Sequence, residues 1–271
     1  MMRALWSAAS GMIAQQTNVD TISNNLANVN TTGYKKETVE FKSLLYQTVQ
    51  SKTTSANGET KPIGAQVGLG VRNSSITSVF DQGNLNETSK DTDFAIDGKG
   101  FFSVRGEDGE TYYTRNGNFV WANGVDGVTL TNSQGLPVLD ENGSAIVLEE
   151  GIDASKVTIA VRGNICYPDE QNNLQTMGAK IGLSQFVNPA GLEKLGGSLY
   201  KETEASGMAA SESMDDSLTK SKIRQGYIES SNVQVVDEMV NLIVAQRAYE
   251  MNSKAIQAAD DMLSQANQLK R

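Results

Sequence analysis

The sequence contains no histidine and a single cysteine, Cys166, among its 271 residues. Without histidine, Ser-His-Asp and Cys-His catalysis and the common zinc sites are excluded. One cysteine cannot form a disulfide framework, and Cys166 lies next to acidic residues, so its thiol is not activated by nearby cations. Proline is also scarce, and none lies before residue 62 or after residue 189. Both ends of the chain can therefore form long helices.

Long hydrophobic runs and clusters of basic residues are missing as well. No apolar run reaches 18 residues, and the N-terminus lacks a continuous apolar segment before a cleavage site, which argues against membrane insertion and against an ordinary secretory precursor. The net charge of −9 and the absence of clustered Lys and Arg argue against nucleic-acid binding. With 38% hydrophobic residues, the chain can still bury one or two ordinary cores.

Possible metal and catalytic motifs are incomplete. Asp91, Asp93 and Asp97 resemble part of a calcium loop, but Ala95 and Ile96 stand where an EF-hand requires a ligand and a glycine. Paired carboxylates occur only as sequence neighbours, which point to different sides of a strand or helix. We therefore expect no catalytic residue, no cofactor and no metal ion.

The N-terminus predicts a helix of coiled-coil type, which we assign to residues 1–33 as half of an inner helical domain. Seven of eight positions with a mean spacing of 3.5 residues are apolar. Gly33 suits the left-handed residue that often follows a helix. The positions of this seam are Leu5, Ala8, Met12, Gln15, Val19, Ile22, Leu26 and Val29.

The C-terminus repeats the pattern, and we assign residues 227–271 to the second helix of the same domain. Eight of ten positions with this spacing are apolar. Pairing of the two helices would give a coiled-coil-like domain. The positions are Val235, Glu238, Leu242, Ala245, Tyr249, Asn252, Ile256, Ala259, Leu263 and Ala266.

The N-terminal helix ends in asparagines where a solvated helix would carry Lys and Glu. Asp20 is the only charged residue between Ala4 and Tyr34. Neutral amides form directed hydrogen bonds without the desolvation cost of a charge, so they suit a helix surrounded by protein. On this interpretation Asn24, Asn25 and Asn28 belong to an assembly interface; the alternative is a polar helix end with a few capping amides.

The middle of the chain has the composition of a β domain. Between residues 94 and 187, short runs of Phe, Tyr, Val and Ile alternate with six Asp-Gly or Asn-Gly dipeptides, the strongest short hairpin signal. The preceding segment is rich in Ser, Thr, Asn and Gly and is typical of an extended arm. We predict an α+β multidomain protein, with an arm at 34–75 and a mainly antiparallel β domain at 76–226 between the terminal helices.

Several long segments are similar to one protein family. Residues 7–36, "SAASGMIAQQTNVDTISNNLANVNTTGYKK", and 225–263, "QGYIESSNVQVVDEMVNLIVAQRAYEMNSKAIQAADDML", resemble the terminal signatures of bacterial flagellar rod and hook proteins. "IDGKGFFSV", "YTRNGNF" and "FVNPAGLEKLGGSLYKETEASG" in the centre resemble the same family, whereas 149–180 is only loosely similar. The length and the arm at 44–72 are typical of the distal-rod members.

The resemblance implies a structural subunit of the flagellar rod, which self-assembles into a helical tube and transmits torque from motor to hook. It implies terminal helices packed inside, location in the periplasmic basal body, and contacts with proximal-rod, hook and ring proteins. It also implies passage through the flagellar type III export apparatus. Export subunits carry a Phe followed four residues later by an apolar residue, and Phe41 and Leu45 in "FKSLL" match this pattern; alternatively, both simply pack where the first helix meets the arm.

Other interpretations stay open at this point. Within the family, the chain could be a proximal-rod or hook-type subunit. In a second class, the β domain would be a binding module for sheath, bushing or cell-wall partners, and the helices would only tether it. An enzyme fused to export helices is the third class, although no paired catalytic motif supports it.

Overall fold

The computed structural model divides the chain into two units. The helical unit comprises residues 1–27, 37–78 and 234–271, and the β unit comprises 28–36 and 79–233. Long terminal helices and antiparallel strands confirm the α+β class. The structure describes residues 2–50, 64–124, 127–148, 154–168, 173–215 and 217–269, so parts of the expected arm and of segment 149–180 lie outside the described residues.

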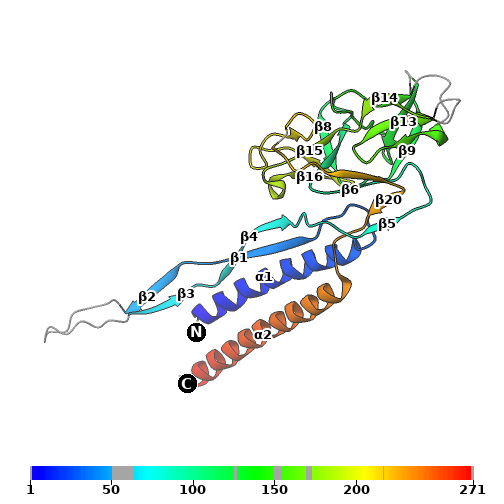
Figure 1. Ribbon diagram of the computed structural model, residues 1–271. Helices are drawn as coiled ribbons and strands as arrows, with labels where there is room; N and C mark the ends of the chain where they lie inside the picture. Colours follow the sequence, from blue (N-terminus) through cyan, green and yellow to red (C-terminus); the bar gives the residue numbers. More distant parts are fainter. Residues whose placement is uncertain are drawn as a thin grey trace. The chain divides into compact units, whose positions relative to one another are not determined.

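The helical unit pairs the two ends of the chain. Helix α1 (Met2–Ala27) and helix α2 (Val235–Gln268) lie side by side, and the two termini are at the same end of the pair, so the helices are antiparallel (Figure 1). The helical unit also contains two antiparallel strand pairs, and the first of them contacts α1. Strand β1 (Glu37–Ser43) pairs with β4 (Val71–Ser78), and β2 (Tyr46–Gln50) pairs with β3 (Ala65–Gly68).

Helix α1 is shorter than the sequence pattern predicts. It ends at Ala27, so Val29 and Gly33 lie beyond it. Asn and Thr are weak helix formers because their side chains compete for backbone hydrogen bonds. Here the Thr31 N–H donates to the Asn28 carbonyl (3.1 Å) and the Thr31 hydroxyl donates to the Asn28 side chain (3.1 Å), which forms a turn instead of another helical turn. Gly33 does adopt the left-handed conformation, with φ of +69°.

The β unit consists of antiparallel sheets. Its largest sheet has six strands in the order β16-β17-β8-β7-β15-β18, and two three-stranded sheets have the orders β11-β10-β9 and β12-β13-β14. Two further pairs, β19-β6 and β20-β5, complete the unit. The bounds are β5 Leu85–Glu87, β6 Phe94–Asp97, β7 Phe101–Arg105, β8 Thr111–Thr114, β9 Phe119–Asn123, β10 Val128–Asn132, β11 Val147–Leu148, β12 Thr158–Ile159, β13 Asn164–Pro168, β14 Leu174–Lys180, β15 Leu183–Gln185, β16 Glu193–Gly196, β17 Leu199–Lys201, β18 Ala210–Ser211, β19 Lys222–Gln225 and β20 Tyr227–Glu229.

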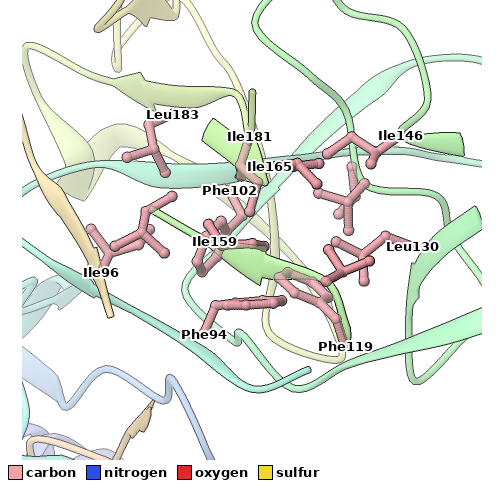
Figure 2. Close-up of a cluster of buried hydrophobic side chains, with 14 of the residues drawn as sticks. Phe94, Ile96, Phe102, Phe119, Leu130, Ile146, Ile159, Ile165, Ile181 and Leu183 are labelled. Carbon is pink, nitrogen blue, oxygen red and sulfur yellow. The ribbon is translucent and has the colours of Figure 1, made fainter. Parts of the chain in front are cut away.

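One apolar core joins most of these sheets. Phe102 and Phe119 meet edge to face at 5.1 Å between ring centroids, and aliphatic side chains from β10, β13 and β15 surround them (Figure 2). A second cluster of aromatic residues lies around Phe101, which is fully buried. The β unit thus has its own closed core, as an independently folding domain requires.

Candidate assembly surfaces

The predicted helix seams are partly buried in the helical unit. Ile22 is 5% exposed, and the small seam residues Ala8, Ala245 and Ala259 are also buried. Most larger seam residues are half-buried, and Val235, Tyr249 and Leu263 are exposed at 40%, 43% and 37%. The half-buried positions are Leu5, Met12, Val19, Leu26 and Val29 of the N-terminal pattern, and Leu242 and Ile256 of the C-terminal one.

Small residues allow α1 and α2 to approach closely. At Gly11, a Cβ atom would lie only 2.9 Å from the side-chain nitrogen of Asn252 on the other helix. Further along the pair, Val19 of α1 and Tyr249 of α2 line a cavity of about 380 Å³ in the helical unit. The two helices therefore approach closely beside Gly11, and they leave a cavity beside the partly exposed Tyr249.

Asn25 is the asparagine that the structure places inside. Its side chain is fully buried, accepts a hydrogen bond from the Glu37 N–H (2.9 Å), and donates to the Glu37 carbonyl (2.8 Å) and to the Glu238 carboxylate (3.1 Å). One amide thus connects α1, β1 and α2 within the helical unit. Asn24 is exposed and Asn28 is half-buried, so the three asparagines have different surroundings.

Large apolar side chains outside the seam are exposed on both helices. Trp6 and Ile13 of α1 are 69% and 65% exposed, and α2 exposes a further group along its first half. Isolated apolar residues on a surface are ordinary, but a group along one helix marks an interaction surface. The outer face of α2, as we call it, comprises Val236, Met239, Val240, Ile243, Val244 and Met251.

The strand pairs beside α1 carry exposed apolar residues too. Phe41 lies in β1 next to a register shift and is 43% exposed, and Leu45 follows the strand and is 83% exposed. Both side chains of the possible export motif are thus accessible on the subunit. At the inner side, the Val71 N–H donates to the Ser10 hydroxyl (3.3 Å), which fastens β4 to α1.

Within the β unit, sequence reasoning missed a buried cluster of charges. Lys35 donates to the Glu229 carboxylate (2.6 Å) and to the Asp81 carbonyl (2.7 Å), and Arg115 lies 3.4 Å from the other Glu229 oxygen. The Lys35 and Glu229 side chains have no exposed surface. Burial lowers the pKa of Lys35, and the nearby Arg115 lowers this pKa further, while Glu229 opposes both effects. Removing one partner from such a buried cluster leaves a charge without its counter-charge, which strongly destabilises the fold.

Asn232 extends the cluster toward the backbone. Its side chain accepts from the Lys36 N–H (2.7 Å) and donates to the Val79 (2.8 Å) and Asp81 (3.1 Å) carbonyls. We call Lys35, Arg115, Glu229 and Asn232 the polar junction. Lys35 and Asn232 lie in the two terminal signatures, but a pairing across 194 residues, as between Lys35 and Glu229, leaves no trace in a single sequence.

Glycines allow the chain segments around the polar junction to touch. The Gly33 N–H donates to the Glu229 carbonyl (2.8 Å), and a Cβ at this left-handed position would lie 2.7 Å from the Asn116 nitrogen. At Gly83, whose N–H donates to the Glu229 carboxylate (2.9 Å), a Cβ would lie 2.0 Å from the Ser230 carbonyl oxygen. Neither position accepts a side chain without moving the backbone.

A cavity of about 470 Å³ in the β unit is lined by charged residues of both signs, among them Arg162, Lys180, Glu212 and Lys222. Its buried Glu212 accepts hydrogen bonds from Ser221 and Gln185, which is an arrangement that stabilises a loop. Within the described ranges, no group of three Asp, Glu or Cys residues is placed to hold a metal ion. Of the helices described, none has the length and apolar character needed to cross a membrane.

Known protein families match three separate parts of the chain. Three family models match the chain: "Flagella basal body rod protein" at residues 5–35, "Flagellar hook protein FlgE/F/G D1 domain" at 95–167, and "Flagellar basal body rod FlgEFG protein C-terminal" at 224–269. The flagellar basal-body rod protein FlgG of Borreliella burgdorferi is 46% identical over 100% of both chains. The chain belongs to the flagellar basal-body rod FlgG family.

Further FlgG relatives agree over their whole length. The FlgG proteins of Caulobacter vibrioides and of Buchnera aphidicola from Schizaphis graminum are 43% and 42% identical, each over 99% of this chain and 100% of the relative. Members of this family are structural rod proteins, so the chain is a structural component of the flagellar basal body and not an enzyme. The expectation of a flagellar rod protein is thereby confirmed.

Proposed function

We propose that this FlgG-family chain forms the distal rod as a helical homo-oligomer and transmits torque through it from the motor to the hook. The observation that carries the proposal is the outer face of α2, where six large apolar residues are exposed on a rod-family subunit. Burial against neighbours at about 25 cal/mol per Å² of apolar area would stabilise each contact. A contact between two different patches of successive subunits propagates as a helical filament.

In this proposal, α1 and α2 form a coiled-coil-like inner domain, and their seam residues hold the pair together. The spacing of 3.5 residues, the buried Ala8, Ala245 and Ala259, and the closeness at Gly11 support it. The interface residues would be Leu5, Met12, Val19, Ile22, Asn24, Asn25, Leu26, Asn28, Val29, Val235, Leu242, Tyr249, Ile256 and Leu263. The functional division into helices at 1–33 and 227–271, an extended arm at 34–75 and a β domain at 76–226 stays a prediction.

The partners follow from the same assignment. A tube of distal-rod subunits would join the proximal rod to the hook and would turn inside the ring proteins. The exposed Phe41 and Leu45 would be recognised by the type III export gate, since both side chains are accessible on the subunit. A proximal-rod or hook-type role is the alternative within the family.

The proposal is tested with the Leu242→Asp substitution, which places a charge in the half-buried seam of α2. Because a buried, unpaired carboxylate is strongly unfavourable, basal bodies isolated from cells that carry only this variant should lack the distal rod. Gln257→Asp, at an exposed position of the same helix, should leave assembly intact. Normal rods built from the Leu242→Asp subunit would overturn the proposal.

The same cells separate export from assembly. The Leu242→Asp subunit keeps Phe41 and Leu45, so it should still reach the growth medium, whereas alanine at both positions should retain the subunit in the cytoplasm. If the double-alanine subunit is secreted normally, the two residues only pack within the subunit. Immunoblots of medium and cytoplasm measure both outcomes.

A further inference from the structure

We propose that the polar junction is a clamp that locks together every segment of the β unit through which the chain passes to and from the helical unit. The clamp would keep the β unit from being pulled apart at these segments while the rod turns. This inference rests on the proposed torque-transmitting function. Rod formation by itself does not require the clamp, since subunits with loose segments would still present the same helix surfaces.

The chain passes between the two units at four points: 27/28, 36/37, 78/79 and 233/234. In the β unit, these points are the ends of three short segments. Residues 28–36 form the first, the residues after 79 begin the second, and the residues up to 233 end the third. Any force that enters the β unit along the chain therefore enters through these three segments.

The polar junction ties the three segments to one another. Lys35 of the first segment reaches the Asp81 carbonyl of the second and the Glu229 carboxylate of the third. Asn232 of the third segment binds the backbone of Lys36, Val79 and Asp81. The Val79 N–H also donates to the Lys36 carbonyl (2.8 Å), so each pair of segments is joined by at least one hydrogen bond.

Arg115 attaches this clamp to the body of the β unit. Its guanidinium reaches Glu229, donates to the Gly98 carbonyl (2.9 Å) and lies 5.0 Å from the centre of the Phe101 ring in the aromatic core. Hydrogen bonds and ion pairs fix direction and distance, whereas apolar contacts can slide. A polar clamp is therefore suited to segments that must not shift past one another.

Asn25 makes a corresponding tie inside the helical unit. Its side chain holds both backbone groups of Glu37, the first residue after the 36/37 crossing, and contacts Glu238, four residues after the helical unit resumes at Gln234. Each unit thus fastens its own ends of the crossing segments with a side-chain amide, which is fully buried at Asn25 and half-buried at Asn232. The two ties together explain why buried polar groups occur at both places, where apolar residues would otherwise be favoured.

The inference is tested by hydrogen exchange on the full-length unassembled subunit carrying Asn232→Ala. The amides of Gly33, Lys36 and Val79 and of Gly83 report on the clamp because each donates within it. If the polar junction acts as one unit, the hydrogens of all four amides should exchange about tenfold faster or more in the variant than in the wild type. Acceleration of Lys36 alone would show an ordinary local hydrogen bond and would overturn the clamp.

Asn132→Ala is the matched control. The Asn132 side chain likewise binds backbone groups, since it accepts from the Gln134 and Leu136 N–H groups, but it lies at the end of β10 and takes no part in the clamp. This variant should leave the four reporter amides unchanged. Asn232→Asp keeps the acceptor for the Lys36 N–H and removes the donor to the Val79 and Asp81 carbonyls, so it gives a second test if Asn232→Ala fails to fold.

A measurement of torque separates this inference from the proposed function. Cells with Asn232→Ala should still assemble distal rods, but their flagella should stall at a lower load in a tethered-bead assay, whereas Asn132→Ala cells should match wild type. Unchanged stall torque with normal rods would overturn the inference and leave the proposed function standing. If even the wild-type chain is absent from isolated rods, the proposed function itself fails.

Discussion

The two units place their apolar residues in opposite ways. In the β unit, Phe101, Phe102 and Val104 have no exposed surface. In the helical unit, Trp6 and Val236 are 69% and 74% exposed. The β unit thus has a closed apolar core and exposes further apolar residues such as Val187 and Met208, whereas the helical unit exposes a group of them along one face of α2. The difference indicates which part of the subunit is complete alone and which part needs other copies.

The difference between the two units is tested most strongly by a substitution on the outer face of α2. Val244 is 62% exposed, so Val244→Lys should change the stability of the unassembled subunit by less than about 0.5 kcal/mol. In the rod, however, the same lysine would be buried against a neighbour without a partner, and assembly should be lost. Thermal melting of the subunit and electron microscopy of isolated basal bodies measure the two effects.

The control for this variant is Gln257→Lys, which adds the same charge at an exposed position of α2. It should assemble normally. Rods that form equally well with Val244→Lys would mean that the outer face stays in water, and the contrast between the units would lose its functional meaning.

A second substitution tests the same difference in the core of the β unit. Phe102→Ala removes a fully buried ring from the core and should destabilise the β unit by about 3–5 kcal/mol. Val120, in the neighbouring β9 strand, is 50% exposed, and Val120→Ala should cost far less. Urea unfolding followed by near-UV circular dichroism compares the two; equal losses would contradict a closed core.

The smallest effect concerns pH. Burial, aided by Glu202, raises the pKa of Tyr113 to about 12. The unfolded phenol loses its proton near pH 10, so the β unit should lose stability as the pH rises from about 10 to about 12. Tyr113→Phe has no proton to lose and should weaken this decline. Urea midpoints between pH 9 and 11 test it, and identical slopes for both proteins would refute the assignment.

Local signals in the sequence predicted much of the fold. The 3.5-residue spacing located both helices, because periodicity depends only on near neighbours. The Asn-Gly and Asp-Gly dipeptides indicated the β region for the same reason. The end of α1 was misplaced, since the apolar position Val29 continued the pattern after the asparagines and threonines had already ended the helix at Ala27.

The buried polar residues were far harder to foresee. The amide-rich end of α1 suggested buried asparagines, and Asn25 is indeed buried, but Asn24 next to it is exposed. Nothing in the sequence indicated that Lys35 and Glu229 would meet, because they are separated by 194 residues. A lysine beside a helix end ordinarily lies in water. Only the folded arrangement of three segments reveals that this one does not.

The pairing of α1 with α2 also sets the order in which the chain can fold. Asn25 and Glu238, which meet in the helical unit, are 213 residues apart, and α2 ends at Gln268. Such a contact forms only after the 213 residues that separate its partners have been made. The β unit can close earlier, while α1 waits without its partner. A chain that has been made only as far as the β unit therefore lacks the finished helix pair.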